Sequence, residues 1–200
     1  MIKIIILDFG DIFIDLDKSA TARFMGRFGF KKLTPDLDEL FKNYEKGHMS
    51  SRSFLEKVSG HFPMANELDL VTAWNSILLN FPDERLKFIE TLAKEEKYRL
   101  FLLSNTNDIH IEFVKRQMGL ENFNRFKNAF EAFYLSYEMG MRKPDTEIFE
   151  FVLKENNLKA EETLFVDDTK ENTDAASHLG IKTWNLKVGQ EDITQLKAKL

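Results

Sequence analysis

The sequence predicts an α/β protein in which a parallel sheet carries helices on both faces and a small helical unit is inserted after the first strand. Two observations predict the sheet: short, almost wholly apolar runs recur along the chain, and segments with helical spacing of apolar residues separate them. A third observation predicts the insertion, because residues 16–81 show helical spacing and no convincing strand.

The first predicted strand covers residues 2–7, Ile-Lys-Ile-Ile-Ile-Leu. Its β-branched and nearly continuous apolar composition is typical of a strand buried on both faces of a parallel sheet. Runs of the same kind predict further strands at residues 99–103, 163–166 and 181–185, and a less regular run predicts one at residues 132–137.

Helices are expected between these strands. In residues 82–96, Leu86, Ile89 and Ala93 lie on one helical face and Pro82 is near the start, where proline is tolerated. Further helices are expected at residues 109–118, 144–156, 172–179 and 191–200. We therefore expect a core domain formed by residues 1–15 and 82–200, and a helical cap formed by residues 16–81.

The composition excludes several classes of site and partner. The 200 residues contain no cysteine, which rules out disulfides, thiolate metal sites and a cysteine nucleophile. A formal net charge of −5 gives no basic excess, so we expect no nucleic-acid partner. The apolar run at residues 4–7 is too short for an export signal, and no stretch reaches the length of a membrane span. A cytoplasmic location without a membrane partner is the expectation.

Polar side chains follow three of the predicted strands directly. Asp8 follows the first strand, Ser104 and Asn105 end the run at 99–103, and Asp167 and Asp168 follow the run at 163–166. Ligands of open α/β sheets bind outside the carboxyl ends of the strands. These side chains are therefore expected to converge on one site.

In this order, the segments resemble the four motifs of the haloacid dehalogenase (HAD) superfamily of aspartate-nucleophile hydrolases. Asp8 matches the first motif, Ser104 the second, Lys143 in Gly-Met-Arg-Lys-Pro-Asp the third, and Asp167-Asp168 the fourth. The resemblance covers essentially the whole chain and implies a Rossmann-like core with a C1-type helical cap. Within the cap, residues 44–50 and 73–75 resemble the branch of sugar-phosphate phosphatases and the N-terminal phosphatase domain of soluble epoxide hydrolase.

The resemblance implies a Mg²⁺-dependent phosphohydrolase for a small, sugar phosphate-like metabolite, with Asp8 as the nucleophile that forms an aspartyl-phosphate. A covalent intermediate splits hydrolysis into two easier steps. A divalent cation offsets the repulsion between the carboxylates and the phosphate, and Mg²⁺ prefers oxygen ligands. The implied ligands are the Asp8 side chain, the Gly10 carbonyl oxygen and the Asp168 side chain.

The same resemblance implies roles for the other polar residues. Lys143 would be catalytic, because its charge would stabilise the phosphoryl oxygens during transfer. Ser104 and Asn105 would bind the phosphate together with Lys143. Asp167 would hold the lysine or a metal-bound water, and Asn172 would orient the lysine or a neighbouring acid.

One position departs from the pattern of this superfamily. Its phosphatases usually carry a second aspartate two residues after the nucleophile, which protonates the leaving oxygen, and here that position is Gly10. Asp11 lies one place further, which reverses the side-chain direction on an extended segment. One possibility is that the substrate has a good leaving group and needs less protonation. The other is that Asp11 or a cap residue acts as the acid through a local bulge.

Other functions remain open on the sequence alone. A catalytically silent module that binds a phospho-ligand or a protein partner is the main alternative, because the acid at Gly10 is missing. A dehalogenase fits the paired acids Asp167-Asp168 less well, and a phosphomutase would need the missing acid. In the cap, His48, Arg52 and Trp74 are the candidates for substrate specificity. We expect a monomer or a weak homo-oligomer.

Overall fold

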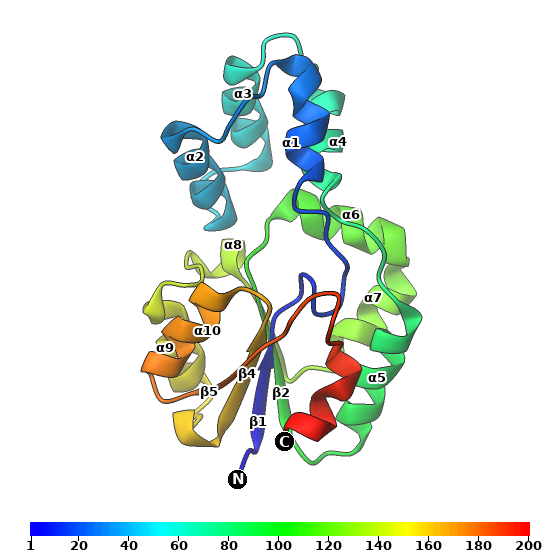
Figure 1. Ribbon diagram of the computed structural model, residues 1–200, viewed down its shortest axis with the longest axis vertical. Coiled ribbons are helices and arrows are strands. Elements are labelled where there is room, and N and C mark those ends of the chain that lie inside the picture. Colours follow the sequence, from blue (N-terminus) through cyan, green and yellow to red (C-terminus); the bar gives the residue numbers. More distant parts are fainter.

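The computed structural model describes residues 1–200 and has a five-stranded parallel sheet at the centre of its larger part (Figure 1). The strand order β3-β2-β1-β4-β5 places the first strand in the middle, and every neighbouring pair is parallel. All carboxyl ends therefore lie at the same edge of the sheet. The strands are β1 Ile4–Leu7, β2 Arg99–Ser104, β3 Ala132–Leu135, β4 Thr163–Asp167 and β5 Lys182–Asn185.

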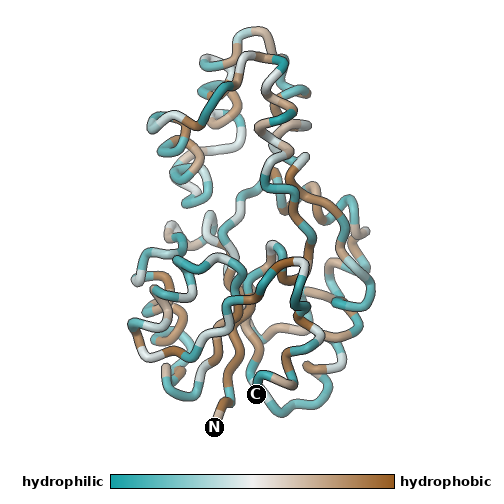
Figure 2. Tube along the Cα trace, viewed as in Figure 1, coloured by the Kyte–Doolittle hydropathy of each residue, from teal (hydrophilic) through white to brown (hydrophobic).

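Alternate residues of the central strand enter two different hydrophobic cores. Ile5 and Leu7 belong to a cluster of 24 buried residues, and Ile4 and Ile6 to a cluster of 10. Both faces of the strand are thus apolar, as a parallel sheet covered by helices requires. Figure 2 shows the apolar character of the central strand as brown colour.

Helices cover both faces of the sheet, as the sequence predicts (Figure 1). The larger cluster takes its helical residues from α5, α6, α7 and the 3₁₀ helix η3, and the smaller takes them from α9 and α10. These elements are α5 Asp83–Lys94, α6 Asp108–Met118, α7 Leu120–Lys127, α9 Thr146–Glu155, α10 Lys170–His178 and η3 Ile193–Lys199; the short α8 covers Ser136–Met139 and the 3₁₀ helix η2 covers Ala160–Glu162.

Three local features differ from the sequence prediction. The strand expected at residues 132–137 ends at Leu135, and the short helix α8 follows it directly. The last helix is a 3₁₀ helix, and its buried residues Ile193 and Leu196 are three apart, which is the period of that helix. Helix α7 has no counterpart among the expected helices. Gly119, at φ +76°, separates it from α6, and its residues Phe123 and Phe126 are buried in the larger cluster.

Four α-helices between β1 and α5 form the cap, which packs around a hydrophobic cluster of its own. Local caps explain where three of them begin: the side chain of Thr34 caps α2, Ser50 caps α3, and Asn66 with Asp69 forms a capping box at α4. The cap elements are α1 Ala20–Met25, the 3₁₀ helix η1 Gly26–Phe28, α2 Pro35–Glu45, α3 Ser51–His61 and α4 Glu67–Asn75.

The chain enters and leaves the cap through two segments that are hydrogen-bonded to each other. The backbone N–H of Asp15 donates to the Asn80 carbonyl, and that of Asp17 donates to the Ile77 carbonyl, both at 2.9 Å. This pairing joins the two segments that connect the cap to the core. The division between cap and core domain at residues 16 and 81 stays a prediction from the sequence. None of the helices combines the length and the apolar character needed to cross a membrane.

Candidate active site

A polar pocket of about 330 Å³ lies at the carboxyl edge of the sheet. Its walls come from the ends of β1, β2 and β4, from the loop before α9, from the start of α10 and from the segment that leads into the cap. The lining residues are Asp8, Gly10, Leu16, Lys18, Asn105, Arg142, Lys143, Pro144, Asp168, Thr169, Glu171 and Asn172.

Lys143 joins two of the carboxylates at this edge. Its ammonium Nζ lies 2.6 Å from Asp8 Oδ1 and 2.7 Å from Asp167 Oδ2, and it donates a third hydrogen bond of 2.8 Å to the Leu103 carbonyl. The three donors of the ammonium are therefore all engaged. The Lys143 side chain is 1% exposed, so this cation is held rigidly at the end of β1.

Burial and ion pairing act in opposite directions on the pKa of Asp8 and on the pKa of Lys143. Loss of hydration raises the pKa of Asp8 to about 7, against the opposing effect of the Lys143 charge, while the Asp167 charge adds to the rise. Burial alone would lower the pKa of Lys143, but the two carboxylates outweigh it and raise that pKa. Lys143 is therefore a fixed cation, and Asp8 is a carboxylate that a further positive charge would stabilise.

Asn105 holds the backbone of Lys143 through a reciprocal pair of hydrogen bonds. Its Nδ2 donates to the Lys143 carbonyl, and its Oδ1 accepts from the Lys143 N–H, both at 2.8 Å. The end of β2 thus positions the lysine. Ser104 is 2% exposed and lies outside the pocket lining, with a 3.5 Å hydrogen bond from Oγ to the Asn105 carbonyl.

Asp167 is saturated by donors from its own segment and from Lys143. Oδ1 accepts from the Thr169 N–H at 2.8 Å, and the Asn172 Nδ2 lies 3.1 Å from Oδ1 and 3.0 Å from Oδ2. This carboxylate is fully buried and orients Lys143, whereas Asp168 lines the pocket.

The donor set suits a hard divalent cation. One carboxylate oxygen from each of Asp8, Asp167 and Asp168 lies within 4.8 Å of the others, and Gly10 lines the same pocket. Mg²⁺ takes oxygen ligands and commonly keeps several waters and substrate oxygens. Of these three aspartates, Asp8 and Asp168 line the open pocket, whereas Asp167 lies behind it.

The space beside Gly10 is filled by an apolar side chain. A Cβ at this position would lie 2.8 Å from Leu16 Cδ1, so a longer side chain here requires Leu16 to move. Asp11 adopts a left-handed conformation at φ +55°; its Oδ1 accepts from the Leu16 N–H at 3.0 Å, and its Oδ2 lies 3.0 Å from Lys18 Nζ. Asp11 is not part of the pocket lining.

Comparison with known proteins finds a family whose model covers most of this chain. The family model of the haloacid dehalogenase-like hydrolases matches residues 2–180. The chain belongs to this family. It is therefore a HAD-like hydrolase, and its parallel sheet with helical cap is the fold that the motifs imply.

Three relatives show how far the similarity to the HAD-like hydrolases reaches. A D-ribitol-5-phosphate phosphatase from Bacteroides thetaiotaomicron is 28% identical over 96% of this chain and 95% of its own length. A HAD family enzyme from the same organism, solved with magnesium and inorganic phosphate, is 32% identical with a TM-score of 0.78, over 96% of this chain and 97% of the other. A sesquiterpene phosphatase from Aspergillus oryzae is 34% identical over half of this chain and 48% of its own length.

The structure of this HAD-like hydrolase brings most of the sequence-predicted residues together, but not all. Asp8, Gly10, Asn105, Lys143, Asp168 and Asn172 line one pocket, and Asp167 lies directly behind it. The exposed His48 and Arg52 lie outside that lining; the Arg52 side chain is 89% exposed and pairs with Glu56.

Trp74 also lies outside the polar pocket, in a network that joins the cap to the core. Its indole Nε1 donates to Asn107 Oδ1 at 3.1 Å, and its carbonyl accepts from His110 Nε2 at 3.0 Å. The ring of His110 stacks on that of Trp74 with centroids 5.3 Å apart.

Two cationic residues that line the pocket, Lys18 and Arg142, were not among the site residues predicted from the sequence. Lys18 Nζ lies 2.5 Å from Asp168 Oδ2, at the point where the chain enters the cap. Arg142 pairs with Glu45 at the end of α2, with 3.0 Å between Nη2 and Oε2. The sequence could have pointed to Arg142, because it directly precedes Lys143. No sequence feature singles out Lys18, which lies in a polar stretch among acidic residues.

Proposed function

We propose that this HAD-like hydrolase is a Mg²⁺-dependent phosphatase that hydrolyses a small phosphomonoester of the sugar-phosphate type through an aspartyl-phosphate on Asp8. The observation that carries the proposal is the ion-pair geometry around Asp8: a buried lysine on one side and the Asp168 carboxylate within metal-binding distance. The ribitol-phosphate phosphatase similarity over almost the full length supports the same class of substrate.

A magnesium ion would be held by the Asp8 and Asp168 side chains and by the Gly10 carbonyl, with Asp167 outside the direct ligands. When bound, the ion would neutralise the carboxylates and polarise the phosphoryl oxygens. The oxygen-only donor set and the HAD family enzyme solved with magnesium and phosphate support this assignment. Positive charge at this place would also favour the ionised, nucleophilic form of Asp8.

The protein side chains would divide the chemistry between them. A carboxylate oxygen of Asp8 attacks phosphorus, the phosphorus–ester bond breaks, and the released alkoxide takes up a proton to leave as the alcohol. Water then attacks the phosphorus of the aspartyl-phosphate, which regenerates the carboxylate and releases phosphate. Lys143 stabilises the charge on the transferring group, and Asn105 contributes to its binding from the pocket wall.

The site has no aspartate at position 10, two residues after the nucleophile, to protonate the leaving group. Leu16 fills the place beside Gly10, and the Asp11 carboxylate is engaged by Leu16 and Lys18. These contacts argue against Asp11 as the direct proton donor to the leaving group. They favour a substrate whose leaving group needs little protonation, or a proton delivered by water in the pocket. An Asp11→Asn variant with unchanged turnover would support this reading.

A panel of phosphorylated metabolites that includes D-ribitol 5-phosphate tests the proposal. Phosphate release is measured for the wild type and for Asp8→Asn, with Mg²⁺ and with excess chelator. We expect release that requires Mg²⁺ and is lost in Asp8→Asn. Hydrolysis that survives this substitution would reject Asp8 as nucleophile, and binding without hydrolysis at any Mg²⁺ concentration would favour the silent phospho-ligand module.

A further inference from the structure

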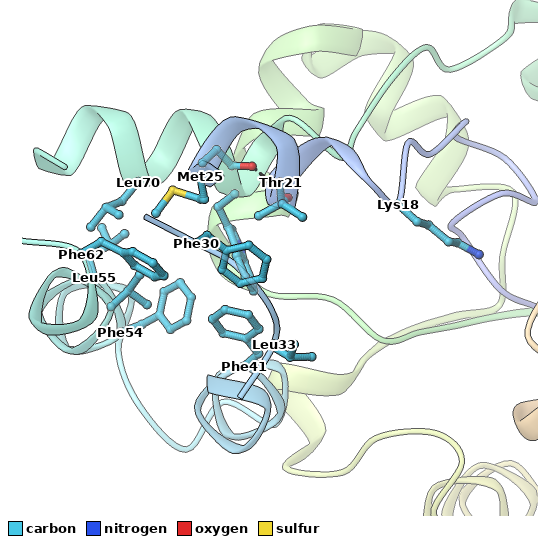
Figure 3. A pocket seen from close by; sticks show the side chains of 14 residues that line it. Lys18, Thr21, Met25, Phe30, Leu33, Phe41, Phe54, Leu55, Phe62 and Leu70 are labelled. Atoms are coloured by element: carbon cyan, nitrogen blue, oxygen red, sulfur yellow. Dashed lines mark hydrogen bonds between the residues drawn. The ribbon is translucent and has the colours of Figure 1, made fainter. Parts of the chain in front are cut away.

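The cap contains a second cavity whose chemistry is opposite to that of the polar pocket. It has a volume of about 280 Å³, and 12 of its 14 lining residues are hydrophobic. Four helices supply the walls: Met25 from α1, Phe41 from α2, Phe54 from α3 and Leu70 from α4 (Figure 3). Its size approaches that of sites that bind small molecules.

Lys18 connects this cavity to the polar pocket, because it belongs to the lining of both. Its ammonium pairs with Asp168 and Asp11 at the sheet edge. Figure 3 shows Lys18 at one end of the cavity, with its ammonium directed away from the aromatic side chains. The polar pocket and the cap cavity therefore meet at Lys18.

The polar groups of the cavity are already engaged. The Thr21 hydroxyl donates to the Ala73 carbonyl at 2.9 Å, and the indole N–H of Trp74 donates to Asn107. Lys18 has its two carboxylate partners. A polyol in this cavity would lose its hydration without gaining hydrogen bonds, which is unfavourable, whereas an apolar group would gain free energy from leaving water.

The walls of the cavity are preformed by aromatic packing. The Trp74 ring lies 4.9 Å from the Phe41 ring and 4.8 Å from the Phe54 ring, centroid to centroid, and the Phe54 ring stacks on that of Tyr44 at 4.0 Å. Rings held by neighbours on several sides do not collapse into an adjoining space at low cost. The cavity therefore offers a stable apolar surface to a ligand.

We propose that the enzyme also hydrolyses phosphate monoesters of apolar alcohols, with the phosphate in the polar pocket and the hydrocarbon part in the cap cavity. This inference rests on the proposed phosphatase function and adds the class of alcohol that the cap receives. The occupant is a short aliphatic or branched hydrocarbon group, because the volume admits no helix or folded segment of a partner protein.

A series of n-alkyl phosphates from ethyl to octyl, assayed below their micellar concentrations, tests the inference. We expect kcat/KM to rise by up to about fourfold for each methylene that enters the cavity and then to level off. A flat series, with ethyl phosphate as good a substrate as octyl phosphate, would overturn the inference while leaving the phosphatase function standing. Failure to hydrolyse any phosphate, sugar phosphates included, would reject the proposed function instead.

A matched pair of variants assigns the effect to the cavity. Ala22 is an exposed lining residue on α1, and Ala22→Phe places a ring at the cavity. Thr72 is exposed on α4 and is not a lining residue, so Thr72→Phe adds the same ring elsewhere on the cap. We expect Ala22→Phe to abolish the chain-length dependence, and Thr72→Phe to behave as the wild type. Equal length dependence in all three proteins would contradict the assignment.

Binding without catalysis provides an independent measurement. Octan-1-ol has the hydrocarbon part but no phosphate, and the ring of Trp74 lines the cavity. We expect saturable quenching or enhancement of tryptophan fluorescence by octan-1-ol in the wild type and in Thr72→Phe, and at least tenfold weaker binding in Ala22→Phe. Absence of saturable binding to the wild type would count against the cavity as a hydrocarbon site.

Discussion

The Nζ atom of Lys143 lies 2.6 Å from Asp8 Oδ1, and the side chain that carries it is 1% exposed. A cation buried so completely balances Asp8 and Asp167 in the folded state. In this HAD-like hydrolase, the same contact therefore serves the stability of the sheet edge and the electrostatics of the pocket. Substitutions at this pair should therefore change both stability and activity. Substitutions at other contacts should change mainly one of the two.

Replacing Lys143 with methionine should reduce both activity and stability. The substitution leaves two buried carboxylates without their cation, and breaking a buried ion pair costs about 3–5 kcal/mol. Loss of one charged group that stabilises a transferring phosphoryl group is expected to lower kcat by about 10²-fold or more. Urea unfolding and steady-state kinetics measure the two effects. The control Lys170→Met removes an exposed pair with Asp174 and should change stability by less than about 0.5 kcal/mol.

Asn105→Ala should remove the anchor of Lys143, together with a proposed phosphate contact, while it leaves the lysine charge in place. The variant keeps Lys143 but removes both hydrogen bonds that hold its backbone. We expect the free energy of unfolding to fall by about 1–3 kcal/mol, because a buried donor and acceptor lose their partners. Activity should fall less than in Lys143→Met. Asn124→Ala, at an exposed position of α7 with no side-chain hydrogen bond in the structure, is the control; a fall of the same size there would refute the positioning role.

Gly47 allows the cap to approach the core closely, and a methyl group there should disturb this approach. Its φ is +69°, and an added Cβ would lie 2.0 Å from the Tyr137 carbonyl oxygen. Gly47→Ala should therefore destabilise the protein by at least about 1–2 kcal/mol, from the left-handed conformation alone. Gly60→Ala in α3 meets nothing within 4 Å and should instead stabilise by about 0.5–1 kcal/mol. Chemical denaturation of both variants checks the opposite signs.

The core domain and its pocket illustrate how much of the structure the sequence can predict. The strands, most core helices and the convergence of Asp8 and Asp168 follow from apolar periodicity and strand-end positions, because parallel strands bring their carboxyl ends to one edge. Lys143 follows no strand, and only the resemblance to the family motifs predicts its place at the site. Contacts across the cap boundary could not be predicted in the same way. The place of Lys18 depends on the paired segments that enter and leave the cap, and the cap cavity depends on how four helices pack. Neither arrangement has a local signal in the sequence.

His110 makes the junction between cap and core sensitive to acid. Burial lowers the pKa of His110 to about 4, against the effect of its hydrogen bond to the Trp74 carbonyl. The unfolded chain takes up this proton near pH 6.5 and the folded protein only near pH 4, so stability from this group is complete above pH 6.5 and is lost as the pH falls toward 4. The difference between the two pKa values limits the loss to roughly 3 kcal/mol. Urea unfolding at pH 7.5 and 4.5 should show a smaller decline in His110→Phe than in the wild type. His61→Gln removes an exposed histidine and should decline as the wild type does; equal declines in all three proteins would mean that His110 is not the titrating group.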